Sequence, residues 1–148
     1  MHFNRIRQEV LCQERAEAEL RAELGEMRER MAREQRSRSA AAAASAKHRP
    51  GGLVDIEFIS QLGVLSTART FPRVLRATAT LDQLRELSAV GWLDAVDAQQ
   101  LVQTAKALRQ QRMMISLTGT VDAAEAPVDC SRSRALFEAL FGAVNNGN

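Results

Sequence analysis

Residues 50–65 read PGGLVDIEFISQLGVL, the stretch richest in apolar residues in the chain. A proline followed by two glycines ends any preceding helix, so the clearest structural boundary falls here. Apolar side chains then recur at helical spacing at Phe58, Ile59, Leu62 and Leu65. Asp55 and Glu57 would lie in the first turn of this helix, where negative charge is favoured. A buried strand over 53–59 is the alternative.

Two further helices are predicted beyond a break at Phe71-Pro72. Thr80 is a candidate N-cap for the first helix, and Gly91 lies just past its end. The buried candidates in that helix are Leu81, Leu84, Leu87 and Val90. Asp94 can cap the second helix. Its buried candidates include Val96, Leu101, Leu108 and Ile115.

The C-terminal part predicts a loop and one last helix. The loop covers 118–129 and contains Pro127, and Ser131 opens the helix. Its apolar face consists of Leu136, Phe137, Leu140, Phe141 and Val144. Residues 145–148 are expected to be a disordered tail.

The N-terminal part is highly charged but balanced, with nine Arg and eight Glu in residues 1–38. Such mixing is typical of a solvated helix surface. Apolar residues fall on one face at Phe3, Ile6, Val10 and Leu11, and a second seam follows at Leu20, Leu24, Met27 and Met31. One continuous helix, or two helices broken near 13–16, fits this pattern. The low-complexity stretch 37–46 is either a flexible linker or a continuation of the helix, because alanine is the best helix former.

Composition narrows the fold class. A chain of 148 residues is about one domain, and 45% hydrophobic residues are enough for one core. Three prolines and eight glycines argue against a fold built from many tight turns. We therefore predict an all-α protein, an antiparallel helical bundle over 51–144. A connecting helical arm (1–36) and an Ala/Ser-rich linker (37–50) precede this bundle.

Charge and cysteine content indicate the compartment and exclude some partners. The 20 Lys plus Arg nearly balance the 18 Asp plus Glu, and the basic residues are interleaved with Glu, so we expect no nucleic-acid partner. Cys12 and Cys130 lie far apart and read as free thiols in a cytoplasmic protein. No apolar run reaches the roughly 18 residues of a membrane span, so no membrane association is expected.

The only constellation that suggests chemistry is the segment 47–58. The sequence contains no phosphate-binding loop, dinucleotide-binding motif or metalloprotease motif. His2 and His48 are too isolated to form a metal site. Lys47 and two neighbouring basic residues precede Gly51 and Gly52, whose exposed backbone amides could hold an anion. Asp55 and Glu57 follow, and carboxylates are ligands that Mg²⁺ prefers. A helix stop with a capping Asp explains the same residues.

The segment GGLVDIEFISQ (51–61) resembles the GG-x-x-DIEF-x-x-Q signature of glutamine synthetase adenylyltransferase, a bifunctional adenylyl-transferring and adenylyl-removing enzyme of bacterial nitrogen regulation. Residues 3–11 and 26–31 are similar to the family's F-x-x-IRxEVL and E-x-x-EMREKM stretches. The similarity continues to the helical domain of the family and covers roughly residues 3 to 117. The better match is to the C-terminal, adenylylating module.

This resemblance implies a bundle that follows a nucleotidyltransferase domain, where a Gly-Ser turn and an Asp-x-Asp pair hold Mg²⁺ and ATP. The present chain contains no Asp-x-Asp. The resemblance therefore implies a C-terminal fragment that is inactive alone and binds neither ATP nor Mg²⁺ tightly. By position, Lys47, Gly51 and Gly52 are candidates for nucleotide binding, and Asp55 and Glu57 for orienting the loop or assisting the metal. Glutamine synthetase and the PII signalling protein are the implied partners.

The alternative function is a non-enzymatic helical interaction module. The seam of Leu20, Leu24, Met27 and Met31 motivates it, because an uncovered apolar seam could self-associate.

Overall fold

The computed structural model describes residues 17–119 and 128–142, and all regular structure in this part is helical. The elements are α2 (Glu17–Arg38), α3 (Ala40–Ala43), α4 (Leu53–Thr67), the 3₁₀ turn η1 (Pro72–Arg76), α5 (Thr80–Ala89), α6 (Ala95–Thr118) and α7 (Ser131–Phe141). The all-α prediction is confirmed, and 53–59 forms part of a helix rather than a strand. No helix in the described part is long and apolar enough to cross a membrane.

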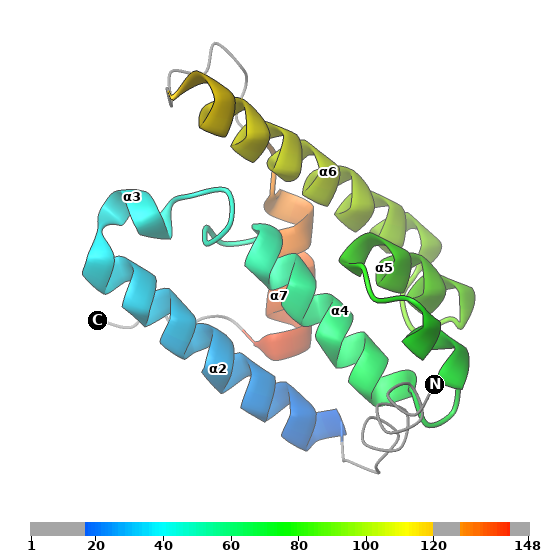
Figure 1. The fold of residues 1–148 in the computed structure, drawn as a ribbon. Coiled ribbons are helices and arrows are strands. Elements are labelled where there is room, and N and C mark those ends of the chain that lie inside the picture. Colours follow the sequence, from blue (N-terminus) through cyan, green and yellow to red (C-terminus); the bar gives the residue numbers. More distant parts are fainter. Residues whose placement is uncertain (1–16, 120–127, 143–148) are drawn as a thin grey trace, which may run out of the picture.

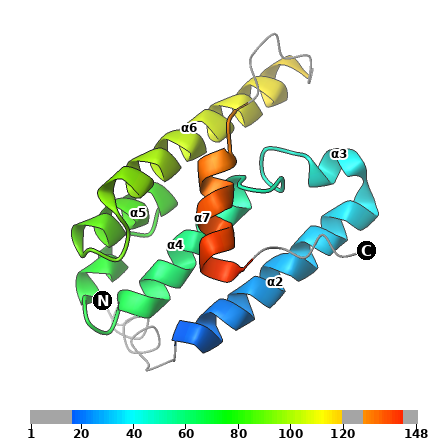
Figure 2. The same cartoon turned by 180° about the vertical axis from the view of Figure 1, so that it is seen from behind.

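Helix α4 lies at the centre of the molecule and contacts α2, α5, α6 and α7. Figure 1 shows α2, α4 and α6 running in alternating directions, with α5 at the far end of α4. Seen from behind in Figure 2, α7 crosses α4 in the space between α2 and α6. The described part of the charged segment, residues 17–38, therefore does not extend away from the other helices. Its helix α2 packs along α4 and α7.

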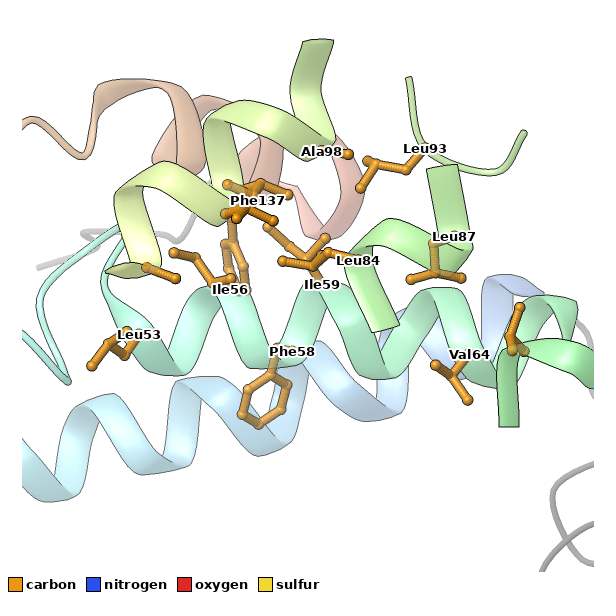
Figure 3. Close-up of a cluster of buried hydrophobic side chains, with 14 of the residues drawn as sticks. Leu53, Ile56, Phe58, Ile59, Val64, Leu84, Leu87, Leu93, Ala98 and Phe137 are labelled. Atoms are coloured by element: carbon orange, nitrogen blue, oxygen red, sulfur yellow. The ribbon is translucent and has the colours of Figure 1, made fainter. Parts of the chain in front are cut away.

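The sequence of α4 explains its central place, because apolar residues cover nearly all of its surface. Ile56, Ile59 and Leu62 are fully buried. Figure 3 shows Ile56 and Ile59 pointing toward Leu84 and Phe137, whereas Phe58 points toward α2 on the opposite side. A helix with so much apolar surface is stable in water only when neighbours cover it, and here they leave exposed only the polar residues Glu57 and Gln61.

The helix boundaries agree with the sequence in part. Asp94 caps α6 as predicted, and its side chain accepts a hydrogen bond from the Val96 amide at 3.1 Å. Val96 itself is 54% exposed, so its predicted burial is wrong: it lies in the solvated first turn. The prediction for Thr80 is also wrong, because Thr80 is already helical and Ala79 is the N-cap without a side-chain bond.

The alanine-rich stretch follows neither of the two alternatives fully. Helix α2 ends at Arg38, and Ser39 interrupts the path with extended backbone. The Ser39 hydroxyl oxygen then accepts a hydrogen bond from the Ala42 amide at 2.9 Å and caps the short helix α3. The predictions for residues 1–16, for Pro127 and for Val144 with the tail lie outside the described residues.

Gly63 offers a test of the packing around α4. A Cβ at this position would lie 2.5 Å from Leu87 Cδ1 and 2.7 Å from the Trp92 ring. We expect Gly63→Ala to lower the free energy of unfolding by about 1–3 kcal/mol, because overpacking outweighs the better helix propensity of alanine. Urea denaturation measures this change.

Gly25 in α2 is the matched control. Among the residues that the structure describes, a Cβ there meets only Phe141 Cδ1, at an ordinary 3.8 Å. Gly25→Ala should therefore raise the free energy of unfolding, by up to about 1 kcal/mol. Equal effects of the two substitutions would contradict this packing.

Candidate functional site

The segment from Lys47 to Val54 closes into a compact loop before α4. The Gly52 amide donates to Arg49 O at 2.8 Å, and the Val54 amide donates to Lys47 O at 3.0 Å. The Leu53 amide likewise donates to a carbonyl, that of Ala46, at 3.1 Å. The loop thus uses its own carbonyls to satisfy the first amides of the helix, which would otherwise lack partners.

Gly51 is required by both conformation and contact. Its φ of 74° lies in the left-handed region. A Cβ there would lie 2.5 Å from Cys130 O and 2.8 Å from the Arg134 amide nitrogen, because the start of α7 packs directly on the turn. The Ser133 hydroxyl is buried and donates to Gly51 O at 2.6 Å. The loop is therefore tied to α7.

Asp55 holds the same loop from the other side. Its Oδ2 accepts a hydrogen bond from the Gly51 amide at 2.7 Å, and its Oδ1 pairs with Arg28 Nε. Arg28 Nη2 in turn donates to His48 O at 2.9 Å. Only 5% of Arg28 and 4% of Asp55 are exposed. This buried ion pair joins α2, the loop and α4.

The sequence did not reveal Arg28 as a buried residue. Mixed charge in 1–38 indicated a solvated surface, and that interpretation is wrong at this position. A signal was present, since position 28 is four residues beyond Leu24 and three before Met31, and so lies on the apolar seam. An arginine on such a face requires a buried acidic partner, which Asp55 provides.

The structure separates the predicted site residues. Gly51 and Gly52 are buried, whereas Lys47 and Glu57 are exposed. The amides from Gly51 to Val54 all donate within the protein, so the expected exposed-amide cradle for an anion is wrong. A nucleotide role for Lys47, Gly51 and Gly52, and a metal role for Asp55 and Glu57, stay predictions. Within residues 17–119 and 128–142, no group of three or more His, Cys, Asp or Glu side chains is placed to hold a metal ion.

Positive charge gathers around the loop from several elements. Burial lowers the pKa of His48 below 6.5, and four nearby cations lower it further. These cations are Lys47, Arg28, Arg112 and Arg38. Arg49 adds a link to α6, since its Nη2 donates to Gln111 Oε1 at 3.0 Å. Burial also raises the pKa of the Cys130 thiol, which is free.

A cleft of about 480 Å³ lies between α2 and α7. Arg28, Asp55 and His48 line it. Lys47, Gly51, Gly52 and Glu57 are not among its lining residues.

These observations define an all-helical module in which a buried ion pair and two glycines fix one loop. The family described as GlnD PII-uridylyltransferase matches residues 18–140. The chain therefore belongs to this family.

Three relatives show which enzymes carry a similar module. All three are named bifunctional glutamine synthetase adenylyltransferase/adenylyl-removing enzyme. The protein from Idiomarina loihiensis is 34% identical over 131 residues, which cover 88% of this chain and 14% of the relative. The protein from Burkholderia mallei is 32% identical over 96% of this chain and 15% of its own length. The protein from Xanthomonas campestris pv. campestris is 41% identical over 65% of this chain and 10% of its own length. The chain thus spans only 10–15% of the curated relatives it matches.

Breaking the Arg28–Asp55 pair should destabilise the fold strongly. Asp55→Asn leaves a buried guanidinium without its counter-charge, and Arg28→Met leaves a buried carboxylate. We expect each to lower the free energy of unfolding by about 3–5 kcal/mol. The double variant should lose clearly less than the sum, because neither charge is then left alone. Chemical denaturation of the four proteins measures the coupling.

The exposed pair Arg85–Asp82, 3.1 Å apart on α5, is the control. Arg85→Ala should change the free energy of unfolding by about 1 kcal/mol or less. Additive effects of Arg28→Met and Asp55→Asn would show that the two side chains are not coupled.

His48 predicts a pH dependence of stability. Its pKa is lower in the folded protein than in the unfolded chain, so below pH 6.5 the unfolded chain binds more protons. The free energy of unfolding should therefore fall as the pH drops from about 6.5 toward the folded pKa. His48→Gln should flatten this part of the profile, measured by urea denaturation between about pH 7.5 and about pH 5.5. An unchanged slope in the variant would contradict the assignment.

Proposed function

We propose that this chain is the helical module of an enzyme that transfers adenylyl groups from ATP to glutamine synthetase, and that it does not catalyse this transfer by itself. The observation that supports the proposal is the family match over 18–140, which includes the whole Gly-Gly loop and α4. Relatives named for this activity are 32–41% identical to the chain. The signalling protein PII is a further proposed partner, in line with the name of the family.

The residues of the loop suggest how the module contributes. The buried ion pair, with the Asp55–Gly51 hydrogen bond, fixes the path of the loop. Lys47 extends from this fixed loop into solvent, where its ammonium could contact a phosphate of ATP held by an adjoining transferase domain. Glu57 is exposed on α4 and is the carboxylate still available to assist a metal ion.

The chemistry also explains why the chain alone should be inactive. Adenylyl transfer requires Mg²⁺ to stabilise charge on the phosphates while the acceptor hydroxyl attacks. In the resembling family an Asp-x-Asp pair holds that ion, and this sequence contains none. Asp55 cannot take over the role without giving up Arg28 and the Gly51 amide.

Two activity measurements test the proposal. The purified chain, incubated with ATP, Mg²⁺ and glutamine synthetase, should leave no label on the acceptor, whereas the Idiomarina loihiensis relative labels it. Label transferred by the chain alone would refute the inactivity. In the second measurement, this chain replaces the matching segment of that relative, and the chimera should adenylylate glutamine synthetase. A chimera that folds without any activity would refute the module function.

The two lysines of the chain provide a matched pair within the chimera. Lys47→Ala should raise the KM for ATP about tenfold or more, since a hydrogen bond to a charged group contributes about 1.5–3 kcal/mol. Lys106→Ala, also exposed but on α6, should leave the KM unchanged. Equal effects of the two substitutions on the KM for ATP would show that Lys47 does not contact the nucleotide.

The alternative, a non-enzymatic interaction module, now rests on a different surface. The seam that motivated it is covered at three of its four residues: Leu20 is 2% exposed, and Leu24 and Met31 pack against the core, whereas Met27 is 47% exposed. The exposed apolar residues at the end of α6 support it instead, namely Met113, Met114 and Leu117. Light scattering over a range of concentrations tests self-association, and a strict monomer would argue against it.

A further inference from the structure

We propose that the cleft between α2 and α7 binds a small organic anion, a carboxylate or phosphate group carried on an apolar body. The cleft is a different place from the exposed Lys47 side chain of the proposed nucleotide contact. The inference does not depend on the proposed function.

The size and walls of the cleft suit such a ligand. Its volume of about 480 Å³ lies within the range of roughly 300–1,000 Å³ that is typical of small-molecule sites. Apolar surface comes from Pro50, Phe137 and Phe141. The two phenylalanine rings lie with their centroids 4.6 Å apart and form one aromatic wall on α7. An apolar or aromatic body would lie against this wall.

Unpartnered donors indicate the charge of the ligand. Arg28 lines the cleft and is 5% exposed, yet its Nη1 has no hydrogen-bond partner among residues 17–119 and 128–142. A second guanidinium donor, Arg21 Nε, is also buried without a partner in the described part of the chain and belongs to a residue of the cleft. His48 Nδ1 is unpartnered there as well, but a neutral imidazole nitrogen can accept as well as donate, so it does not indicate the charge of the ligand. A buried guanidinium N–H without an acceptor costs free energy, and an arginine stays protonated at any pH of interest. An anionic oxygen supplies the missing acceptor.

Gly25 provides an independent argument for an open site. It lies inside α2, where glycine costs about 1 kcal/mol relative to alanine. Packing against the described residues does not require the glycine, because a Cβ would make only one ordinary contact with them, at 3.8 Å to Phe141. The missing side chain leaves room in the cleft, which Gly25 lines together with Phe141 on the opposite helix.

The carboxylates of the cleft limit the ligand to one anionic group. Asp55 is already paired with Arg28, and Glu138 accepts from Arg134 Nε at 3.1 Å. Glu26 and Glu29 are exposed and line the cleft as well. These carboxylates repel negative charge, and a triphosphate, which carries several charges, is repelled more strongly than a single carboxylate or phosphate group. The cleft is therefore expected to disfavour ATP.

NMR titration of the full chain tests the proposal, with phenyl phosphate and benzoate as probes. At least one probe should produce saturable shifts of backbone amides in α2 and α7 around Gly25 and Phe137. Comparing the affinities of phenyl phosphate and benzoate shows whether the cleft prefers a phosphate or a carboxylate group. Benzyl alcohol and ATP should each bind at least about tenfold more weakly, a difference of about 1.4 kcal/mol. The proposal is overturned if neither anion saturates, or if benzyl alcohol binds equally well.

Two substitutions on one helix complete the test. Gly25→Leu should fill the cleft and weaken binding at least about tenfold, while circular dichroism confirms that the chain is folded. Ala18→Leu, at an exposed position of α2 outside the cleft, should bind like the wild type. Arg28→Lys keeps the charge opposite Asp55 but removes Nη1, and it should weaken binding as well. Unchanged affinity in Gly25→Leu would refute the site.

Discussion

Two opposite charges removed from water constrain the whole arrangement around α4. Arg28 and Asp55 are almost fully buried, and each makes a further hydrogen bond to the loop before α4, Arg28 through Nη2 and Asp55 through Oδ2. Burying a single charge without its partner is far more costly than burying the pair. Packing of α2 against α4 in another register would separate these side chains and leave buried charges unpaired, which disfavours it. The pair contributes more to specificity of packing than to net stability, since a well-packed apolar pair could be equally stable.

The loop takes its shape from that constraint and from α7. The Gly51 amide is bonded to Asp55, and the Gly51 carbonyl is bonded to Ser133. Gly51 is thus held from two helices that are far apart in sequence. Because the backbone amides of the turn are all used internally, only side chains of the loop remain to meet another molecule. This is why Lys47, rather than the glycines, is the group through which the loop could contact a phosphate.

Features that depend on residues close together in the sequence were predictable, whereas features that depend on contacts between distant residues were not. Local signals identified the all-α class, the cap at Asp94 and the break at Pro50, because each depends on neighbours within a few residues. The periodicity of 53–59 left helix and strand open, as short apolar runs do. Resemblance supplied the family, which composition and spacing could not. The contacts that define the loop join residues 27 and 82 positions apart, and no local pattern encodes such pairs.

Arg28 is shared between the loop and the cleft, and this has consequences for both. Its Nε and Nη2 bond to Asp55 and the His48 carbonyl, while its Nη1 has no partner in the part of the chain that the structure describes. A guanidinium is rigid and planar. A ligand bound at Nη1 therefore cannot turn the guanidinium without disturbing its bonds to Asp55 and to the His48 carbonyl. Binding in the cleft could alter the loop only if the ligand bound one arrangement of Arg28 better than another. The buried pair leaves little freedom for a second arrangement, so the loop is expected to keep its shape whether the cleft is filled or not.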